Sequence, residues 1–421
     1  MIYFQRRSYF STPQPSKFSG ENPTIPRGWR YPCNRSAVPV LPDELVLWEI
    51  LVRVPSKELL RCRAACRSWR RATSDPAFLL AHHRHQPSLP LVAFPLIMSL
   101  DDFAYDKVDA LDLRRFPSVR RPVLGFNGSH KGYPGGFTIH ASYNGLLLLS
   151  FSSHRRLYLC NPATRQWLGL GDLPEDSYVA ALYPHRPSGE YRILYWKKHS
   201  SNINDGSDAY YVLTIGSSHG RCIGLPVASP SMKNHTTCWG IHGRQRYVLL
   251  HDGVYWYNSH DDILDSKIVI FNTVAESFRW MQPPTATSAA DVLQMDGTVG
   301  IAHVNLDAMT AQVWVLQDQE KEIWSSKLRV KLPYEEMKKD VKCVDDFLWG
   351  TVVSENGDVL LASENCLFHC DSKGKLLKKF ILQNVEPTIL RLYFKESLVR
   401  HAFFERKDGR RARMPRCFRG L

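Results

Sequence analysis

One short unit recurs along the chain, in the segments LYLCNPATRQWLGL, IVIFNTVAESFRWMQPP and LFHCDSKGKLLKKFIL. Each segment has an apolar run, an Asn or Asp, a short polar turn and a second hydrophobic run. This order is typical of a β-hairpin, because the Asn or Asp side chain bonds its own backbone and closes the turn. Hairpins that repeat along a long chain predict a β-propeller, in which radial repetition protects the sheet edges.

The region from Leu91 to Phe404 has the composition of a strand-rich domain. Its apolar runs are short, rich in Val, Ile, Tyr, Phe and Trp, and separated by Gly, Asn, Asp and Pro, and Asn356-Gly357 predicts a tight hairpin. At about 40–50 residues per blade we expect roughly six to eight blades. The predicted strands are Gly145 to Phe151, Arg156 to Cys160, Tyr191 to Trp196, Tyr210 to Ile215, Tyr247 to His251, Gly253 to Tyr257, Lys267 to Phe271, Val299 to Val304, Gln312 to Gln317, Leu348 to Val353, Val359 to Ala362 and Cys366 to Cys370.

The segment from Val40 to His85 has a helical pattern instead. Leu-Pro-Asp-Glu at residues 41–44 predicts a helix start, since proline tolerates the first turn and carboxylates favour the positive end of the helix dipole. Ser56 is the expected N-cap of a second helix, and Asp75-Pro76 starts a last one. So short a segment buries little surface alone, and several of its large apolar side chains are expected to be left for a partner.

This helical segment closely resembles an F-box. The family pattern is Leu-Pro, an acidic residue, an apolar helix ending in Ile-Leu, a Val/Leu-Pro break, Leu-Leu, Cys-x-x-Trp and Asp-Pro-x-Phe, and all its parts occur here in order. Ala65 is a small departure, because the family often has valine there. The resemblance implies docking onto the Skp-type adaptor of a cullin-RING ubiquitin ligase; a generic helical cap is the alternative. The expected adaptor-binding residues are Leu41, Pro42, Leu45, Ile50, Leu51, Val54, Pro55, Leu59, Leu60 and Trp69.

A second resemblance covers roughly residues 91–404. Gly145-Leu146-Leu147 followed by CNPATRQWLGLGDLP is similar to the opening of the plant F-box-associated domain. VLLHDGVYWY, IVIFNTVAESF and AQVWVLQD resemble later elements of that family, with Asn272 where the family usually has Asp. The resemblance implies a propeller-like domain that recruits a target protein. We therefore expect a non-catalytic substrate receptor of an SCF-type ligase, without cofactor or metal; an adaptor-binding F-box protein that acts without degradation is the alternative.

The net charge of +13 lies mostly in the two ends of the chain. Residues 1–37 carry +5 and residues 406–421 carry +6, which leaves +2 between them. The expected organisation is a disordered leader at 1–37, an F-box at 38–85, a propeller-like domain at 86–405 and a basic disordered tail at 406–421. A mitochondrial presequence is an alternative interpretation of the leader. A nuclear import signal or a nucleic-acid-binding segment is an alternative interpretation of the tail.

The expected compartment is the nucleus and/or the cytoplasm. No apolar run approaches the length of a membrane span, so no membrane partner is expected. Ten cysteines without regular spacing do not make a disulfide framework, which favours a reducing compartment.

Four groups of residues could carry other chemistry. Ser218 lies in a G-x-S-x-G pattern after a predicted strand, but RCIGLPVASP follows where a nucleophile elbow needs a helix, so a hairpin loop is the favoured interpretation and a serine hydrolase the alternative. Cys366 and Cys370, with His369 between them, lack a second ligand pair for zinc and are expected in the core. His82, His83 and His85 are expected to be solvated at a helix end, and Asp261, Asp262 and Asp265 to form a solvated turn.

Overall fold

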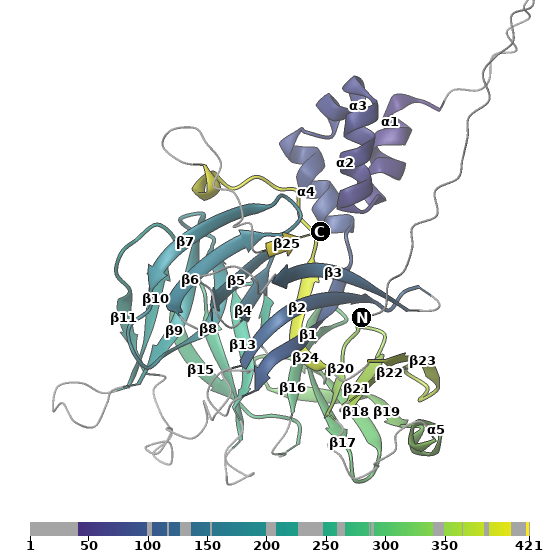
Figure 1. Ribbon diagram of the computed structural model, residues 1–421. Helices are drawn as coiled ribbons and strands as arrows, with labels where there is room; N and C mark the ends of the chain where they lie inside the picture. Colours follow the sequence, from purple (N-terminus) through teal and green to yellow (C-terminus); the bar gives the residue numbers. More distant parts are fainter. Residues whose placement is uncertain are drawn as a thin grey trace, which may run out of the picture. The chain divides into compact units, whose positions relative to one another are not determined.

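The computed structural model describes residues 41–98, 103–115, 118–126, 136–151, 154–198, 208–225, 247–258, 266–285, 287, 290–339, 349–363, 365–382, 387–405 and 418–420. The chain divides into two compact units, Met1–Pro42 and Asp43–Leu421. The second unit holds a helical module, residues 43–85, and a strand-rich domain that begins at Ser88 (Figure 1).

The helical module begins and ends close to where the sequence predicts. In α4, Asp75 Oδ1 accepts hydrogen bonds from the backbone N–H groups of Ala77 at 2.8 Å and Phe78 at 3.3 Å, as expected for an N-cap. The elements are α1 (Asp43–Leu45), the π-helix η1 (Val46–Ile50), the 3-10 helix η2 (Leu51–Arg53), α2 (Ser56–Ala65), α3 (Arg67–Ala72) and α4 (Pro76–His85).

The prediction that Ser56 caps α2 is wrong. Pro55 occupies the N-cap position and has no side chain that could accept a hydrogen bond. The N–H of Ser56 donates instead to Glu396 Oε2 at 2.9 Å, so a carboxylate of the strand-rich domain satisfies the start of α2. A sequence pattern can locate a helix start, but it cannot name a capping partner 340 positions away.

Within the described residues the strands form six four-stranded antiparallel blades, the lower end of the expected range. The nine-stranded sheet counts as two blades, because a single residue pair, Tyr105 with Phe137, joins β2 to β4. The first two blades are β24 (Thr388–Lys395), β1 (Ser88–Met98), β2 (Phe103–Asp112), β3 (Val119–Phe126), and β4 (Phe137–Tyr143), β5 (Leu146–Phe151), β6 (His154–Asn161), β7 (Gln166–Asp172). The others are β8 (Ser177–His185), β9 (Glu190–Lys197), β10 (Ala209–Thr214), β11 (Arg221–Gly224); β12 (Tyr247–Leu250), β13 (Gly253–Asn258), β14 (Lys267–Asn272), β15 (Ser277–Met281); β16 (Asp291–Met295), β17 (Thr298–Asn305), β18 (Thr310–Asp318), β19 (Ile323–Lys331); and β20 (Trp349–Val352), β21 (Val359–Ser363), β22 (Cys366–Cys370), β23 (Leu376–Ile381).

The first and last long strands of the domain belong to one blade. β24 pairs antiparallel with β1, with Ser88 opposite Lys395 and Ala93 opposite Thr388. β24 also contacts β4, and β4, β8, β12, β16 and β20 contact one another in sequence order (Figure 1). Pairing of the two ends in one sheet closes a propeller and leaves only short strand edges free. The predicted propeller-like fold is therefore confirmed.

Polar turns close the three repeated hairpins in the way the sequence predicts. Asn161 Oδ1 accepts from the N–H of Thr164 at 3.2 Å. Asn272 Oδ1 accepts from the N–H groups of the residues two and three positions later, at 2.9 and 2.8 Å, and Asp371 Oδ1 does so for Lys373 and Lys375, also at 2.9 and 2.8 Å. Asn272 thus closes the same type of turn as an aspartate, because each uses a side-chain oxygen.

The twelve predicted strands each overlap an observed strand, but sequence patterns missed several others. The region also contains a short helix, α5 (Tyr334–Lys338). Phe418–Gly420 form β25, which pairs with β3, whereas disorder was expected for the whole tail. The pairing partner of β25 lies almost three hundred positions earlier, which local composition cannot reveal.

Alternate residues along a strand serve two different interfaces between blades. Val254 and Trp256 of β13 pack in one core with residues of β8 to β10, whereas Tyr255 and Tyr257 pack in another with residues of β16 and β17. All six residues of β13 are buried. Each blade is therefore covered on both faces by its neighbours, and the core is divided into layers between blades.

Ion pairs also join neighbouring blades. Glu276, in the turn between β14 and β15, pairs with Arg192 of β9 at 2.7 Å and with Arg221 of β11. The hydroxyl of Tyr183 on β8 donates to Glu276 Oε1 at 2.8 Å. The Glu276 side chain is only 8% exposed, so this network fixes one blade against the next with little screening by solvent.

Candidate functional site

Four large apolar side chains in the first three elements and α2 of the helical module face solvent. Leu45 is 48% exposed, Trp48 42%, Ile50 47% and Leu60 41%. They come from α1, η1 and α2, and we call them the exposed apolar set. The ring of Trp48 also lies 5.6 Å from that of Phe78, which is fully buried, so Trp48 connects the surface with the module's core. Large apolar side chains that face solvent are groups that a partner could bury.

The π-helical turn explains why apolar residues three positions apart in the sequence take different environments. Helical spacing places Leu45, Trp48 and Leu51 on one face of an ordinary α-helix. η1 lies between the first and last of them and has a wider turn than an α-helix, which changes the angle between successive side chains. Leu51 is consequently only 3% exposed, while Leu45 remains at the surface.

The predicted adaptor-binding residues fall into three environments. Those that are buried build the module's core together with Val52, Phe78 and Leu79, and Leu398 of the strand-rich domain joins that core. Trp48 was not among the predicted residues. Leu41 (56%), Pro42, Leu45, Ile50 and Leu60 are exposed, Val54, Pro55 and Trp69 are half-buried, and Leu51 and Leu59 are buried.

Basic side chains accompany these apolar groups. Arg67, Arg70 and Arg71 of α3 are exposed and have no ion pair with a carboxylate in the described part of the chain. Arg63 is half-buried, and its Nε donates to Thr73 Oγ1 at 2.8 Å. Burial lowers the pKa of Arg63, with the charge of Arg400 adding to the effect. Arg63 therefore has a structural role, while the arginines of α3 are available to an acidic partner.

The helical module is fastened to the propeller at the end of β24. His83 Nδ1 donates to the backbone oxygen of Glu396 at 2.9 Å, and the other ring nitrogen lies 3.3 Å from Asn144 Oδ1, in the turn between β4 and β5. Lys395 Nζ donates to the backbone oxygen of Arg84 at 3.0 Å. Together with the Glu396 contact to Ser56, these bonds hold two helices of the module to one strand end.

The motif Asn161-Pro162-Ala163-Thr164 contributes to the same junction. Asn161 is fully buried, and its Nδ2 donates to the backbone oxygen of Ser397 at 3.0 Å. Ala163 packs against the module's core. The family motif therefore closes a hairpin and also anchors the segment that follows β24.

The expectation that the helix-end histidines are solvated is wrong for two of the three. His82 and His83 are buried and only His85 is exposed. His82 Nε2 donates to the backbone oxygen of Val54 at 2.7 Å, which fixes the Val-Pro break of the motif. Burial lowers the pKa of both His82 and His83, so both rings are neutral near pH 7. The sequence pattern missed this because the propeller covers the end of α4.

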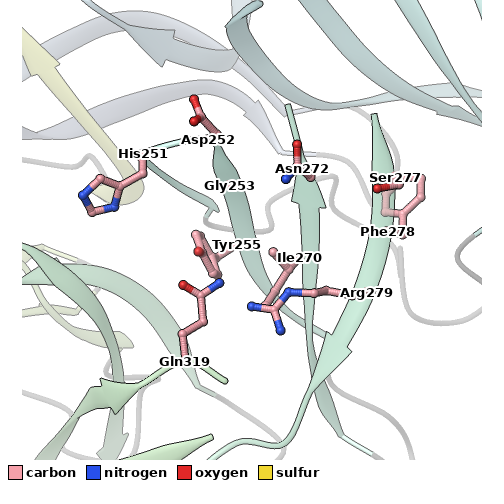
Figure 2. A pocket seen from close by; sticks show the side chains of 10 residues that line it. All are labelled: His251, Asp252, Gly253, Tyr255, Ile270, Asn272, Ser277, Phe278, Arg279 and Gln319. Carbon is pink, nitrogen blue, oxygen red and sulfur yellow. The ribbon is translucent and has the colours of Figure 1, made fainter. Parts of the chain in front are cut away.

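The strand-rich domain carries a cavity of about 300 Å³ beside β13, β14 and β15 (Figure 2). Three of its lining residues, Gly253, Tyr255 and Ile270, are buried, and the others are mostly polar. Nothing in the sequence pattern pointed to it, because one lining residue, Gln319, comes from the turn between β18 and β19 in the next blade. The lining residues are His251, Asp252, Gly253, Tyr255, Ile270, Asn272, Ser277, Phe278, Arg279 and Gln319.

The other candidate residues are not assembled into a site. Ser218 lies in the exposed turn between β10 and β11, so a strand rather than a helix follows it. Cys366 and Cys370 are buried in the core around Phe368, as predicted. The aspartates at 261, 262 and 265 lie outside the described residues.

His369 belongs to an interblade contact. Its Nδ1 lies 2.8 Å from Ser118 Oγ, and its Nε2 lies 3.4 Å from Asp358 Oδ1. Ser118 and His369 are both buried, and neither lines the cavity. The three side chains therefore join the blade of β1–β3 to that of β20–β23.

The described residues contain neither a cluster of metal-ligating side chains nor a helix that could span a membrane. Among these residues, no three His, Cys, Asp or Glu side chains lie in a group that could hold a metal ion. Across the same part of the chain, every helix is too short or too polar to serve as a membrane span.

Comparison with known proteins identifies both regions. A family model described as "F-box associated beta propeller domain" matches residues 120–406, more than half of the chain, and one described as "F-box-like" matches residues 38–85. Two Arabidopsis thaliana relatives are F-box protein At4g19940, 24% identical over 349 residues (78% of this chain, 80% of the relative), and F-box protein At2g40925, 26% identical over 367 residues (80% and 83%). A chain of a nidogen/laminin complex has a TM-score of 0.40 at 9% identity, covering 73% of this chain and 100% of its own, too weak a likeness to carry an argument.

The matches agree with the order of elements in the structure. The F-box-like match ends at residue 85, where α4 ends, and the propeller match includes β24. Both resemblances seen in the sequence are confirmed, and the chain belongs to the plant F-box proteins that carry an F-box-associated β-propeller domain.

Proposed function

We propose that this chain is the non-catalytic substrate receptor of an SCF-type cullin-RING ubiquitin ligase. Residues 38–85 dock a Skp-type adaptor and, through it, cullin, and residues 86–405 recruit a target protein. The observation that carries the proposal is the exposed apolar set on an F-box whose core is otherwise complete. Such a ligase acts in the nucleus or the cytoplasm, where we place this protein.

The exposed members of the predicted residues make the direct contacts. Leu45, Ile50 and Leu60 offer side chains that a partner can bury, and Trp48 joins them. Leu51 and Leu59 act through the fold, because they are already buried in the module. Leu41 and Pro42 precede α1 in the sequence and keep the role that the family motif implies. The arginines of α3 favour an adaptor surface with acidic groups.

The mechanism is proximity. A target held on the propeller has its lysine close to the ubiquitin thioester carried elsewhere in the ligase, which raises the effective concentration of the two reactants. This chain supplies binding and orientation only. The fixed junction at Glu396 and His83 limits the directions in which the target lysine can point.

The test is co-purification of the full chain with a Skp-type adaptor. Leu45→Asp, Ile50→Asp and Leu60→Asp should each weaken binding by about 2 kcal/mol, roughly thirtyfold, because each inserts a charge into the apolar contact. Unfolding temperatures should stay unchanged, since all three positions are exposed. Ile381→Asp is the matched control, since Ile381 is an apolar side chain of the propeller with 72% exposure.

The outcomes of this test distinguish a ligase substrate receptor from a regulatory F-box protein and from a serine hydrolase. Adaptor binding by all three variants at the level of the Ile381→Asp control would sink the assignment of the surface. Adaptor binding without ubiquitin transfer to any bound protein, in a reconstituted ligase, would favour a regulatory F-box protein that acts without degradation. A serine hydrolase would be revealed by labelling of Ser218 with a serine-reactive probe.

A further inference from the structure

We propose that the cavity beside β13, β14 and β15 is a receptor site for an acidic side chain, Asp or Glu, presented by the target protein. The inference rests on the proposed function, because it names the chemistry by which the propeller selects its target. The cavity is lined largely by two segments that resemble family elements, VLLHDGVYWY and IVIFNTVAESF, but the resemblance gives these residues no binding role.

The floor of the cavity is apolar and rigid. Tyr255 and Ile270 are 4% and 3% exposed, and they lie on neighbouring strands of one blade. Gly253 leaves room for the Tyr255 ring: a Cβ at position 253 would lie 2.6–2.8 Å from the ring's far atoms. Any side chain at Gly253 would therefore push the ring out of place. The floor can bury the methylene groups of an Asp or Glu side chain.

One positive charge dominates the rim. Arg279 on β15 is exposed, and none of the carboxylates in the described residues forms an ion pair with it. The nearby carboxylates are already engaged: Asp252 Oδ1 lies 3.0 Å from Arg186 Nε, and Glu276 pairs with Arg192 and Arg221. The guanidinium of Arg279 therefore retains its full capacity for a carboxylate from outside.

Polar groups converge on the same place. The side chains of Arg279 and Gln319 extend toward Tyr255 and Ile270 from opposite sides (Figure 2). Burial raises the pKa of the Tyr255 hydroxyl, while the charge of Arg279 and a hydrogen bond with Gln319 oppose that rise, so both groups act on this hydroxyl. Asn272 uses its oxygen to close its own turn, which leaves its amide N–H₂ as a donor.

This arrangement fits a carboxylate better than a phosphate. A planar guanidinium matches the two oxygens of a carboxylate in a bidentate pair. Phosphate recognition generally employs a cluster of arginines, whereas Arg279 is the single Lys or Arg among the described lining residues. A volume of about 300 Å³ accommodates one side chain with its neighbouring backbone.

The experiment uses the tagged full chain and degenerate peptide arrays in which one position is fixed as Glu, Gln or phosphoserine. We expect the chain to bind the Glu series roughly fivefold more strongly than the Gln series, because one partly exposed ion pair is at stake. Arg279→Glu should abolish this preference and create one for Lys at the same position. Arg329→Glu is the matched control, since Arg329 is an exposed arginine of β19 outside the cavity, and it should leave the preference intact.

The results distinguish this proposal from the ligase assignment. Equal binding of the Glu and Gln series, stronger binding of the phosphoserine series, or an unchanged Glu preference in Arg279→Glu would each overturn the acidic-side-chain site. Adaptor binding is measured on the same preparations. If the unsubstituted chain fails to bind the adaptor, the ligase assignment fails; if it binds the adaptor but shows no preference for the Glu series over the Gln series, the cavity assignment fails.

Discussion

The helical module and the propeller treat their apolar side chains in opposite ways. In the module, Leu45, Trp48, Ile50 and Leu60 remain exposed around a small core. In the propeller, a strand such as β13 is buried along its whole length, because a neighbouring blade covers each face. A ring of blades completes its own interior, whereas a short run of helices depends on surfaces supplied by others. The contrast explains why the module is the region suited to docking.

The largest expected effect separates the two cores. Phe78 is fully buried in the module, and Phe78→Ala should cost about 3–5 kcal/mol of the module's unfolding free energy. The unfolding free energy of so small a core is no larger than this loss. The module should therefore unfold and adaptor binding should be lost, while the propeller stays folded. Phe271→Ala, at a fully buried position of the propeller, is the counterpart and should leave adaptor binding intact. Denaturant unfolding beside adaptor binding measures both; equal loss of adaptor binding in the two variants would break the comparison.

A smaller change in stability is expected when an ion pair is removed, and its size should differ between the propeller and the module. Glu276→Ala should destabilise the propeller by about 2–3 kcal/mol, since Arg192, only 15% exposed, loses its closest carboxylate. Glu49→Gln in the module removes a pair with Arg53 whose side chains are 61% and 52% exposed, and should change stability by no more than about 0.5 kcal/mol. Urea titration of both variants checks this, and similar shifts would show that the interblade network has no special weight.

Acidification should weaken the propeller over one pH window. Burial lowers the pKa of His140, on β4, and of His401, after β24, to about 4, against about 6.5 in an unfolded chain. Between these values the unfolded state binds more protons than the folded state, so stability falls as the pH drops from 6.5 to 4 and is complete above 6.5. The loss should be about 3 kcal/mol for each histidine, since one pKa unit corresponds to about 1.4 kcal/mol.

Substitution identifies the contribution of the histidine near the module. His401 stacks on Phe403 with ring centroids 5.0 Å apart. His401→Gln should flatten the pH dependence of the unfolding free energy, measured by denaturant titration at several pH values. If the unfolding free energy of this variant depended on pH as steeply as that of the unsubstituted chain, His401 would not be a source of the acid sensitivity.

The last prediction concerns the contact that joins the helical module to the propeller. Glu396→Ala should cost about 1 kcal/mol of module stability, the usual value of a helix N-cap, because the Ser56 N–H loses its acceptor. Glu396→Gln retains an oxygen acceptor and should recover most of the loss. Hydrogen exchange of the α2 amides reports the change; unaltered protection in Glu396→Ala would mean that α2 stands independently of the propeller.

Sequence patterns predict structure well where residues close in the sequence determine it. They predict poorly where a distant segment of the chain determines the structure. The turns at Asn161, Asn272 and Asp371 follow from local side-chain bonding, and they were predicted. β1 was missed, because Pro90 and Pro95 interrupt its pattern and its partner β24 lies some three hundred residues later.

The candidate sites show the same division. The F-box motif pointed to residues 38–85, which the F-box-like family model matches, but the exposure of its residues depends on a π-turn and on a covering propeller that no motif encodes. The cavity at Arg279 could not be predicted, because Gln319 reaches it from another blade.

The capping of α2 by Glu396 has a consequence for the order in which the chain is made. Ser56 leaves the ribosome 340 residues before the carboxylate that completes its helix. During synthesis the F-box therefore lacks its cap until β24 has been made and has closed the ring. Products of interrupted translation carry the docking motif without this support. Only a chain that has been translated through β24 therefore has an F-box with a capped α2. We expect full adaptor affinity from such complete chains alone.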